Sequence, residues 1–187
     1  MRLRADGKSG AVRRAAAMGL LLALAVALNA AEGLLPALPA LPPGVRPGLS
    51  NIVTVYCLYC LGAGEALVIA VLKSGFVLLT RGMTAGFLSL SGGVVSLLSM
   101  LAARKIFGSR GRYCPVSMTG AVFHNLGQLA AAALLLKNTA VFYYLPVLLA
   151  AGILMGGLTA VLLKAVMPAL RRVLPVHYQS NHSGKDG

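Results

Sequence analysis

Residues 52–80 read IVTVYCLYCLGAGEALVIAVLKSGFVLLT, an apolar run that is too long for a single untilted membrane helix. The stretch Gly62-Ala63-Gly64-Glu65 interrupts this run, because glycines and a carboxylate break an apolar helix. We therefore predict a short helix over residues 50–61 and a second helix over residues 64–80, joined by a tight turn.

Four further apolar runs lie on either side of this pair and are bounded by charges, glycines or prolines. They predict helices over residues 15–35, 86–103, 115–136 and 142–170. The composition agrees, because 58% of the residues are hydrophobic and only 11% are charged, which suits a surface that faces lipid. The predicted fold class is all-α, a polytopic membrane protein with a bundle of about six transmembrane helices.

The flanks and one long loop differ in composition from this bundle. Residues 1–14 form a basic segment, and residues 171–187 form a polar tail. Within the transmembrane domain of residues 15–170, the stretch 36–49 is rich in proline, which predicts a loop because proline cannot continue a helix. Both flanks are expected in the cytoplasm and the proline-rich loop outside.

The distribution of lysine and arginine supports this orientation. Thirteen of the 17 basic residues fall on the side that holds both ends of the chain, and cytoplasmic loops carry such an excess. An alternative interpretation of the first apolar run is a cleaved signal peptide, since a basic start precedes it and small residues follow it. Charge counting does not separate these two cases.

Several classes of function find no support in the sequence. The net charge of +13 could suggest nucleic acid, but the basic residues sit at the edges of apolar runs rather than along one helix face. The Cys57–Cys60 spacing lies inside a membrane run, where two small helix residues explain it better than a redox or metal site. There is no nucleotide-binding P-loop and no cluster of carboxylates, so we predict no catalytic residues, no metal and no cofactor.

One polar group lies near the middle of the predicted helix 115–136. His124, Asn125 and Gln128 are spaced by one, three and four residues, which favours a shared helix face. Polar side chains at membrane depth are costly, so this group predicts either a substrate-binding patch or a hydrogen-bonded contact between helices.

Two basic residues of the third predicted helix are further candidates for substrate binding. Lys73 lies roughly 13 Å into the helix that begins at Gly64, at about 1.5 Å per residue, and there it needs a partner or an aqueous cavity. Arg81 follows at the outer end, so the outward half is cationic and suits an anionic substrate. Glu32 and Asn29 are three residues apart near the outer end of the first helix. A functional role and a simple position at the membrane interface explain these two residues equally well.

The alanines of the first helix suggest a packing surface. Ala23 and Ala27 have the four-residue spacing that lets helices approach closely. Packing inside the bundle is the default interpretation, whereas an exposed stripe would bind a partner protein.

The sequence resembles the bacterial heptaprenyl diphosphate synthase component I family, also called the Gx transporter family. The resemblance spans roughly residues 15–165. It is carried by Pro47-Gly48-Leu49-Ser50-Asn51-Ile52-Val53, by the Gly62–Glu65 turn, by Ser91-Gly92-Gly93, and most specifically by His124-Asn125-Leu126-Gly127-Gln128. Asn51, which opens the second helix within this pattern, joins the candidate substrate-binding residues.

The layout is also similar to the substrate-binding S components of energy-coupling factor transporters. That similarity implies a bacterial plasma-membrane protein with an outward pocket roofed by the first loop, and a membrane scaffold bound through Ala23 and Ala27. The expected function is uptake of a small anionic or amphipathic metabolite with the help of separate ATPase subunits.

The family name implies a different role, a non-catalytic membrane component that accompanies a prenyltransferase subunit. A third hypothesis is that the chain is a structural partner of another membrane protein and binds no ligand of its own. We favour transport, because the chain lacks the carboxylates that prenyl transfer needs and has a polar patch at midplane.

Overall fold

The computed structural model describes residues 3–34, 50–107 and 113–173, and every regular element in these ranges is helical. The helices are α1 (Leu3–Leu34), α2 (Asn51–Cys60), α3 (Ala63–Arg81), α4 (Met83–Phe107), α5 (Tyr113–Leu136) and α6 (Leu145–Val173), with the 3-10 helix η1 (Thr139–Tyr144) before α6. The proline-rich loop and most of the polar tail lie outside the described residues.

The predicted membrane helices are confirmed with small shifts in their ends. Within the described ranges, five helices are long and apolar enough to cross a membrane, and α2 is a shorter apolar helix of 10 residues. The chain is therefore an all-helical, polytopic membrane protein. The largest difference is that α1 begins at Leu3, so most of the basic segment 1–14 is helical. Helix α4 is longer at both ends than predicted, and a 3-10 turn replaces the first residues of the last predicted helix.

The break between α2 and α3 lies where the glycines predicted it. Gly62 has a φ of 138°, a conformation that side chains with a Cβ rarely adopt. Glu65 lies in the first turn of α3, where a carboxylate suits the positive end of the helix dipole. The second tight turn, at Gly82 between α3 and α4, likewise has a positive φ of 88°.

The outer surface of the bundle is strongly apolar. Leu79, Leu134, Leu154 and Ile106 are each more than 70% exposed, on four different helices. An exposed apolar surface of this kind suits contact with lipid chains rather than with water.

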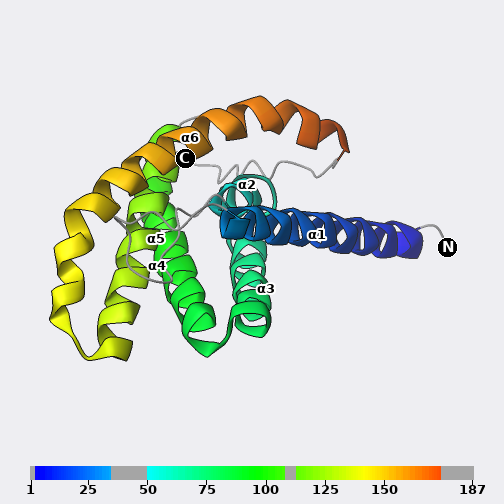
Figure 1. The fold of residues 1–187 in the computed structure, drawn as a ribbon. Coiled ribbons are helices and arrows are strands. Elements are labelled where there is room, and N and C mark those ends of the chain that lie inside the picture. Colours follow the sequence, from blue (N-terminus) through cyan, green and yellow to red (C-terminus); the bar gives the residue numbers. More distant parts are fainter. Residues whose placement is uncertain (1–2, 35–49, 108–112, 174–187) are drawn as a thin grey trace, which may run out of the picture.

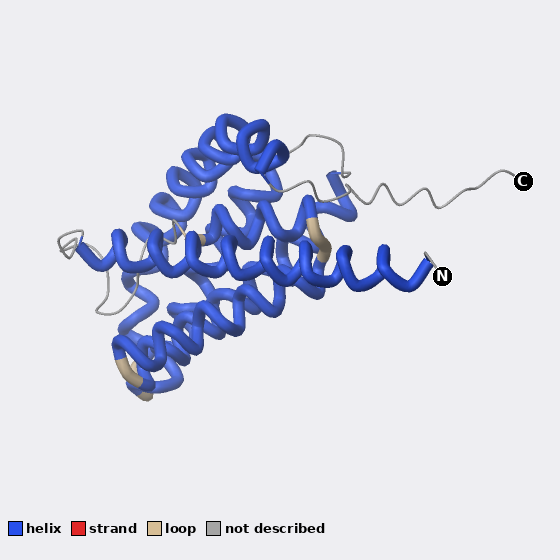
Figure 2. Tube along the Cα trace, turned by 90° about the vertical axis from the view of Figure 1, so that its right-hand side faces the viewer, coloured by secondary structure: helices blue, strands red, loops and turns tan. Residues whose placement is uncertain are grey.

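Helix α2 forms the centre of the bundle. All of its residues except Ile52 are buried, and they form the main core cluster together with residues of α1, α3, α4, α5 and α6. Helices α3 to α6 follow one another as packed neighbours, while α1 lies along α2 and α3 with its first turns extending beyond them (Figure 1). Figure 2 shows the start of α1 and the last turns of α6 on the same side of the molecule.

Glycines allow the closest helix contacts. A Cβ atom on Gly127 of α5 would stand 3.0 Å from Gly92 Cα of α4, and a Cβ on Gly152 of α6 would stand 2.9 Å from Val122 Cα of α5. Small residues permit such close packing of membrane helices. The crossing at Gly92 and Gly127 brings α4 against the part of α5 that carries the predicted polar group.

Candidate functional site

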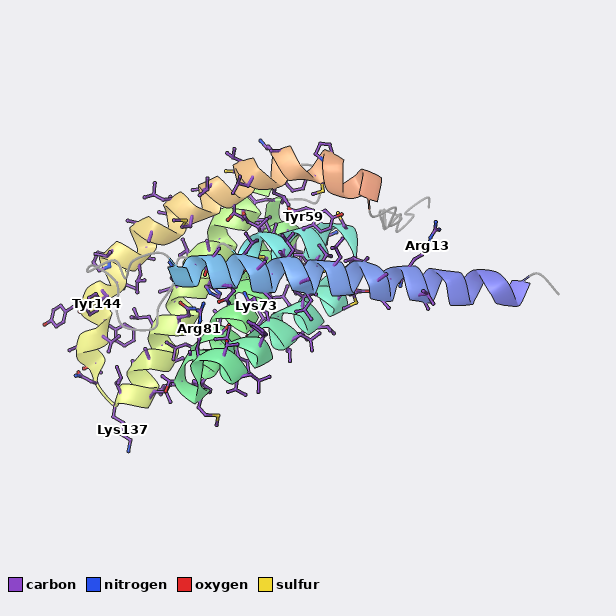
Figure 3. The ribbon with its side chains drawn as sticks, turned by 45° about the vertical axis from the view of Figure 1, so that its right-hand side comes forward. Arg13, Tyr59, Lys73, Arg81, Lys137 and Tyr144 are labelled. Carbon is purple, nitrogen blue, oxygen red and sulfur yellow. The ribbon has the colours of Figure 1, made fainter. Side chains whose placement is uncertain are left out.

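A polar cavity of about 290 Å³ lies among α1, α3, α4, α5 and the residue that precedes α2. Two of its lining residues, Val77 and Ala85, are apolar. The others are polar or charged, and they come from four helices and one helix start: Asn29, Glu32, Ser50, Lys73, Arg81, Ser89, His124 and Gln128. Figure 3 shows Lys73 and Arg81 beside α1, well away from Arg13 near its beginning.

Ser50 links a carboxylate and an ammonium group at this cavity. The Ser50 N–H donates a hydrogen bond of 3.0 Å to Glu32 Oε1, and Lys73 Nζ donates one of 3.2 Å to Ser50 Oγ. Glu32 is 4% exposed and Lys73 is 2% exposed. The carboxylate thus accepts from a backbone N–H at the start of α2, a group that has no partner within its own helix.

Arg81 adds a second cation to the same wall. Its Nη2 donates a hydrogen bond of 2.7 Å to the backbone oxygen of Asn29, which ties the end of α3 to the end of α1. The charged side chains that line the cavity are the cations Lys73 and Arg81 and the anion Glu32, so positive charges exceed negative charges by one. A cavity with a positive excess in a low-dielectric setting favours an anionic ligand.

His124 and Gln128, both from α5, form another part of the lining. Gln128 Nε2 lies 3.1 Å from His124 Nε2, one helical turn away on α5. Within the described part of the chain, Gln128 Oε1 has no hydrogen-bond partner, although the residue is about 95% buried. Buried polar groups are normally paired, so unpaired atoms on a cavity wall point to a bound ligand or water.

Two of the predicted substrate-binding residues are not part of this lining. Asn51 Nδ2 donates to Ser96 Oγ at 3.2 Å, and Ser96 Oγ donates to the Gly120 oxygen at 2.8 Å, so this chain of hydrogen bonds connects α2, α4 and α5. Asn125 Nδ2 donates to the Leu148 oxygen of α6 at 2.9 Å. Both amides act as contacts between helices.

The structure thus brings together Lys73, Arg81, His124 and Gln128 from the predicted set. It adds Ser50 and Ser89, which were not among the predicted site residues, and Glu32 with Asn29, for which an interface role was equally open. The signal for Glu32 was its position in an apolar run; its partner Ser50 is 18 residues further along the chain. No local spacing predicts such a contact.

The alanine stripe of α1 faces outward. Ala23 and Ala27 are exposed, whereas Ala25 between them is fully buried against the core. The two alanines therefore lie on the surface of the described bundle rather than in its core.

Three comparisons with known proteins bear on this site. A family model for heptaprenyl diphosphate synthase component I matches residues 21–166. Among solved structures, the chain is similar to the S component of a bacterial ECF transporter, with 17% identity over 87% of this chain and 95% of the other and a TM-score of 0.58, which shows a shared fold. No curated protein matches the sequence.

Proposed function

The chain belongs to the heptaprenyl diphosphate synthase component I family, and we propose that it is the substrate-binding membrane subunit of an uptake transporter of the energy-coupling factor type. The fold that it shares with an ECF S component supports this proposal. The observation that carries it is the buried polar cavity of about 290 Å³ between Lys73 and Gln128.

The substrate is a small metabolite with an anionic group. Lys73 and Arg81 supply the positive excess on one wall, and an anion there compensates the cost of burying the lysine. The seven isoprene units of a heptaprenyl chain far exceed the volume of this cavity. An amphipathic ligand fits only with its polar part inside and its apolar part toward the lipid.

The cavity opens toward the outer side of the membrane in this proposal. Of its lining residues, Glu32 lies near the end of α1, Arg81 at the end of α3 and Ser50 just before α2, the level that the basic-residue count assigns to the outside. Both termini are then cytoplasmic, in the plasma membrane of a bacterium.

Partner subunits supply the energy for transport. The sequence has no P-loop, so ATP hydrolysis belongs to separate ATPase subunits. The exposed stripe around Ala23 and Ala27 is the surface for a membrane scaffold, because small residues let a partner helix approach closely.

The family description names the second candidate, a membrane component of a prenyl diphosphate synthase. Diphosphate chemistry requires Mg²⁺ held by carboxylates. The chain has four acidic residues: Asp6 and Asp186 lie near its ends, Glu32 near the end of α1, and Glu65 at the start of α3. Such a component would therefore act only beside a catalytic partner.

The proposal is tested by the small molecules that co-purify with the protein. The full chain is purified in detergent, its bound molecules are released with solvent, and they are identified by mass spectrometry. The matched variants are Lys73→Met in the cavity and Lys105→Met, an exposed lysine near the end of α4. We expect a small anion that is retained by the wild type and by Lys105→Met but lost from Lys73→Met.

Two results would contradict the proposal. One is the absence of any small molecule in the wild type, together with stable co-purification of a prenyltransferase subunit. The other is retention of the same molecule at equal occupancy in Lys73→Met, because its binding would then not depend on the cavity.

A further inference from the structure

The side-chain amide of Gln128 has a defined orientation on the cavity wall. Its nitrogen lies 3.1 Å from His124 Nε2. Of these two nitrogens the amide must donate, since an amide nitrogen has no lone pair available to accept a hydrogen bond. Gln128 Oε1 is then left as an acceptor, and it has no partner among the described residues.

Helix α4 packs against the Gln128 and His124 side chains. A Cβ on Gly92 would stand 2.8 Å from Gln128 Cγ and 3.0 Å from His124 Cε1, so both side chains pack directly against the α4 backbone. Gln128 is 5% exposed and belongs to the cavity lining. The unpaired oxygen therefore lies on a buried side chain of the cavity wall, where a ligand atom is the natural source of its missing hydrogen bond.

The size and lining of the cavity limit the ligand further. A volume of about 290 Å³ corresponds to about ten water molecules at roughly 30 Å³ each, the lower end of the range for small-molecule pockets. None of the described residues that line it is phenylalanine, tyrosine or tryptophan, and the His124 ring lies within 3.1 Å of the Gln128 amide. The volume favours a compact molecule.

We propose that the substrate is a compact organic anion that donates a hydrogen bond from an O–H or N–H group to Gln128 Oε1. Its anionic group lies toward Lys73 and Arg81, which line the same cavity. This inference rests on the proposed transport function and specifies the chemical class that the cavity selects.

The test compares hydroxy acids with the same acids lacking the hydroxyl group. The probes are γ-hydroxybutyrate, δ-hydroxyvalerate and ε-hydroxycaproate, each paired with butyrate, valerate or caproate, and their affinities are measured by calorimetry on the full chain purified in detergent. For the length that fits best, we expect the hydroxy acid to bind about tenfold more tightly than its partner, the size of one buried hydrogen bond.

Gln128→Met tests whether Gln128 causes this preference. Methionine fills a similar volume but offers no comparable acceptor, so the ratio of the two affinities should fall to about one. Asn125→Leu is the matched control: it removes an amide from the same helix that does not line the cavity, and the tenfold ratio should persist.

The inference is overturned if no hydroxy acid binds, if each pair binds equally in the wild type, or if the preference survives in Gln128→Met. These results are separable from a failure of the transport proposal. A co-purified anion that lacks an O–H or N–H donor would leave a binding subunit in place and refute only the substrate class.

Discussion

Lys73 Nζ donates a hydrogen bond of 3.2 Å to Ser50 Oγ, although the two residues are 23 positions apart in the chain. Ser50 precedes α2, the buried central helix, and its backbone N–H is bound by Glu32 of α1. One serine therefore connects the cationic wall of the cavity to the start of the helix around which the bundle is built.

Two replacements of Lys73 should show whether ligand binding depends on the positive charge of this side chain or on its shape. We expect Lys73→Met to weaken binding of the co-purified anion by about 5-fold to 150-fold, because the ligand loses a charge-assisted partner worth about 1 to 3 kcal/mol. Lys73→Arg should retain part of the affinity, since it keeps the positive charge but not the shape of the ammonium group.

The measurement is equilibrium binding to the ligand-free protein, with thermal unfolding of the same samples as the control. Methionine removes a buried charge, so the ligand-free Lys73→Met protein should be about as stable as the wild type. If affinity stays unchanged in Lys73→Met, the lysine does not face the ligand.

Asn125→Leu should affect stability rather than binding. The change removes the hydrogen bond from Nδ2 to the Leu148 oxygen, and interhelical hydrogen bonds in membranes contribute about 0.6 to 2 kcal/mol. The expected result is a lower unfolding temperature with normal ligand occupancy of the folded fraction. Reduced affinity at normal stability would instead place Asn125 in the ligand site.

Gly92 and Gly93 make a matched pair for testing the α4–α5 crossing. A Cβ on Gly92 would lie 2.8 Å from Gln128 Cγ and 2.9 Å from the His124 oxygen, whereas a Cβ on Gly93 meets only Ala70 Cβ at 3.6 Å. We expect Gly92→Ala to cost about 1 to 3 kcal/mol through overpacking and to lose the ligand. Gly93→Ala should be tolerated, and thermal unfolding of both variants in detergent distinguishes them.

The alanine stripe can be tested with a control from the same helix. Changing the exposed Ala23 and Ala27 together to Leu should abolish co-purification of the scaffold subunit while the protein stays monodisperse. The buried Ala25 is the contrast, since Ala25→Leu should destabilise the bundle itself by about 1 to 3 kcal/mol. Retained scaffold binding in the double variant would exclude this surface as the partner site.

The orientation in the membrane is tested by thiol labelling in a chain whose Cys57, Cys60 and Cys114 are replaced by Ala. Single cysteines are introduced at Tyr143 in η1 and at Lys105 near the end of α4, both exposed. An impermeant maleimide should label the Tyr143→Cys protein in intact cells and the Lys105→Cys protein only after permeabilisation. Labelling of both from outside would refute cytoplasmic termini.

The membrane helices could be predicted from the sequence because their causes are local. The lengths of the apolar runs set the spans, and Gly62 and Gly82 end helices wherever the rest of the chain lies. The polar positions Lys73, His124 and Gln128 were also visible, because a costly side chain in an apolar run stands out without knowledge of its neighbours.

The grouping of these residues depended on the packing of the helices. His124 and Asn125 are adjacent in sequence, but about 100° separates successive residues around a helix, so His124 lines the cavity while Asn125 bonds to α6. Whether Ala25 or Ala23 is buried depends in the same way on how α1 is rotated against α2 and α3. Local spacing defines the faces of a helix, whereas the crossing of helices at contacts such as Gly92 with Gly127 decides what each face meets.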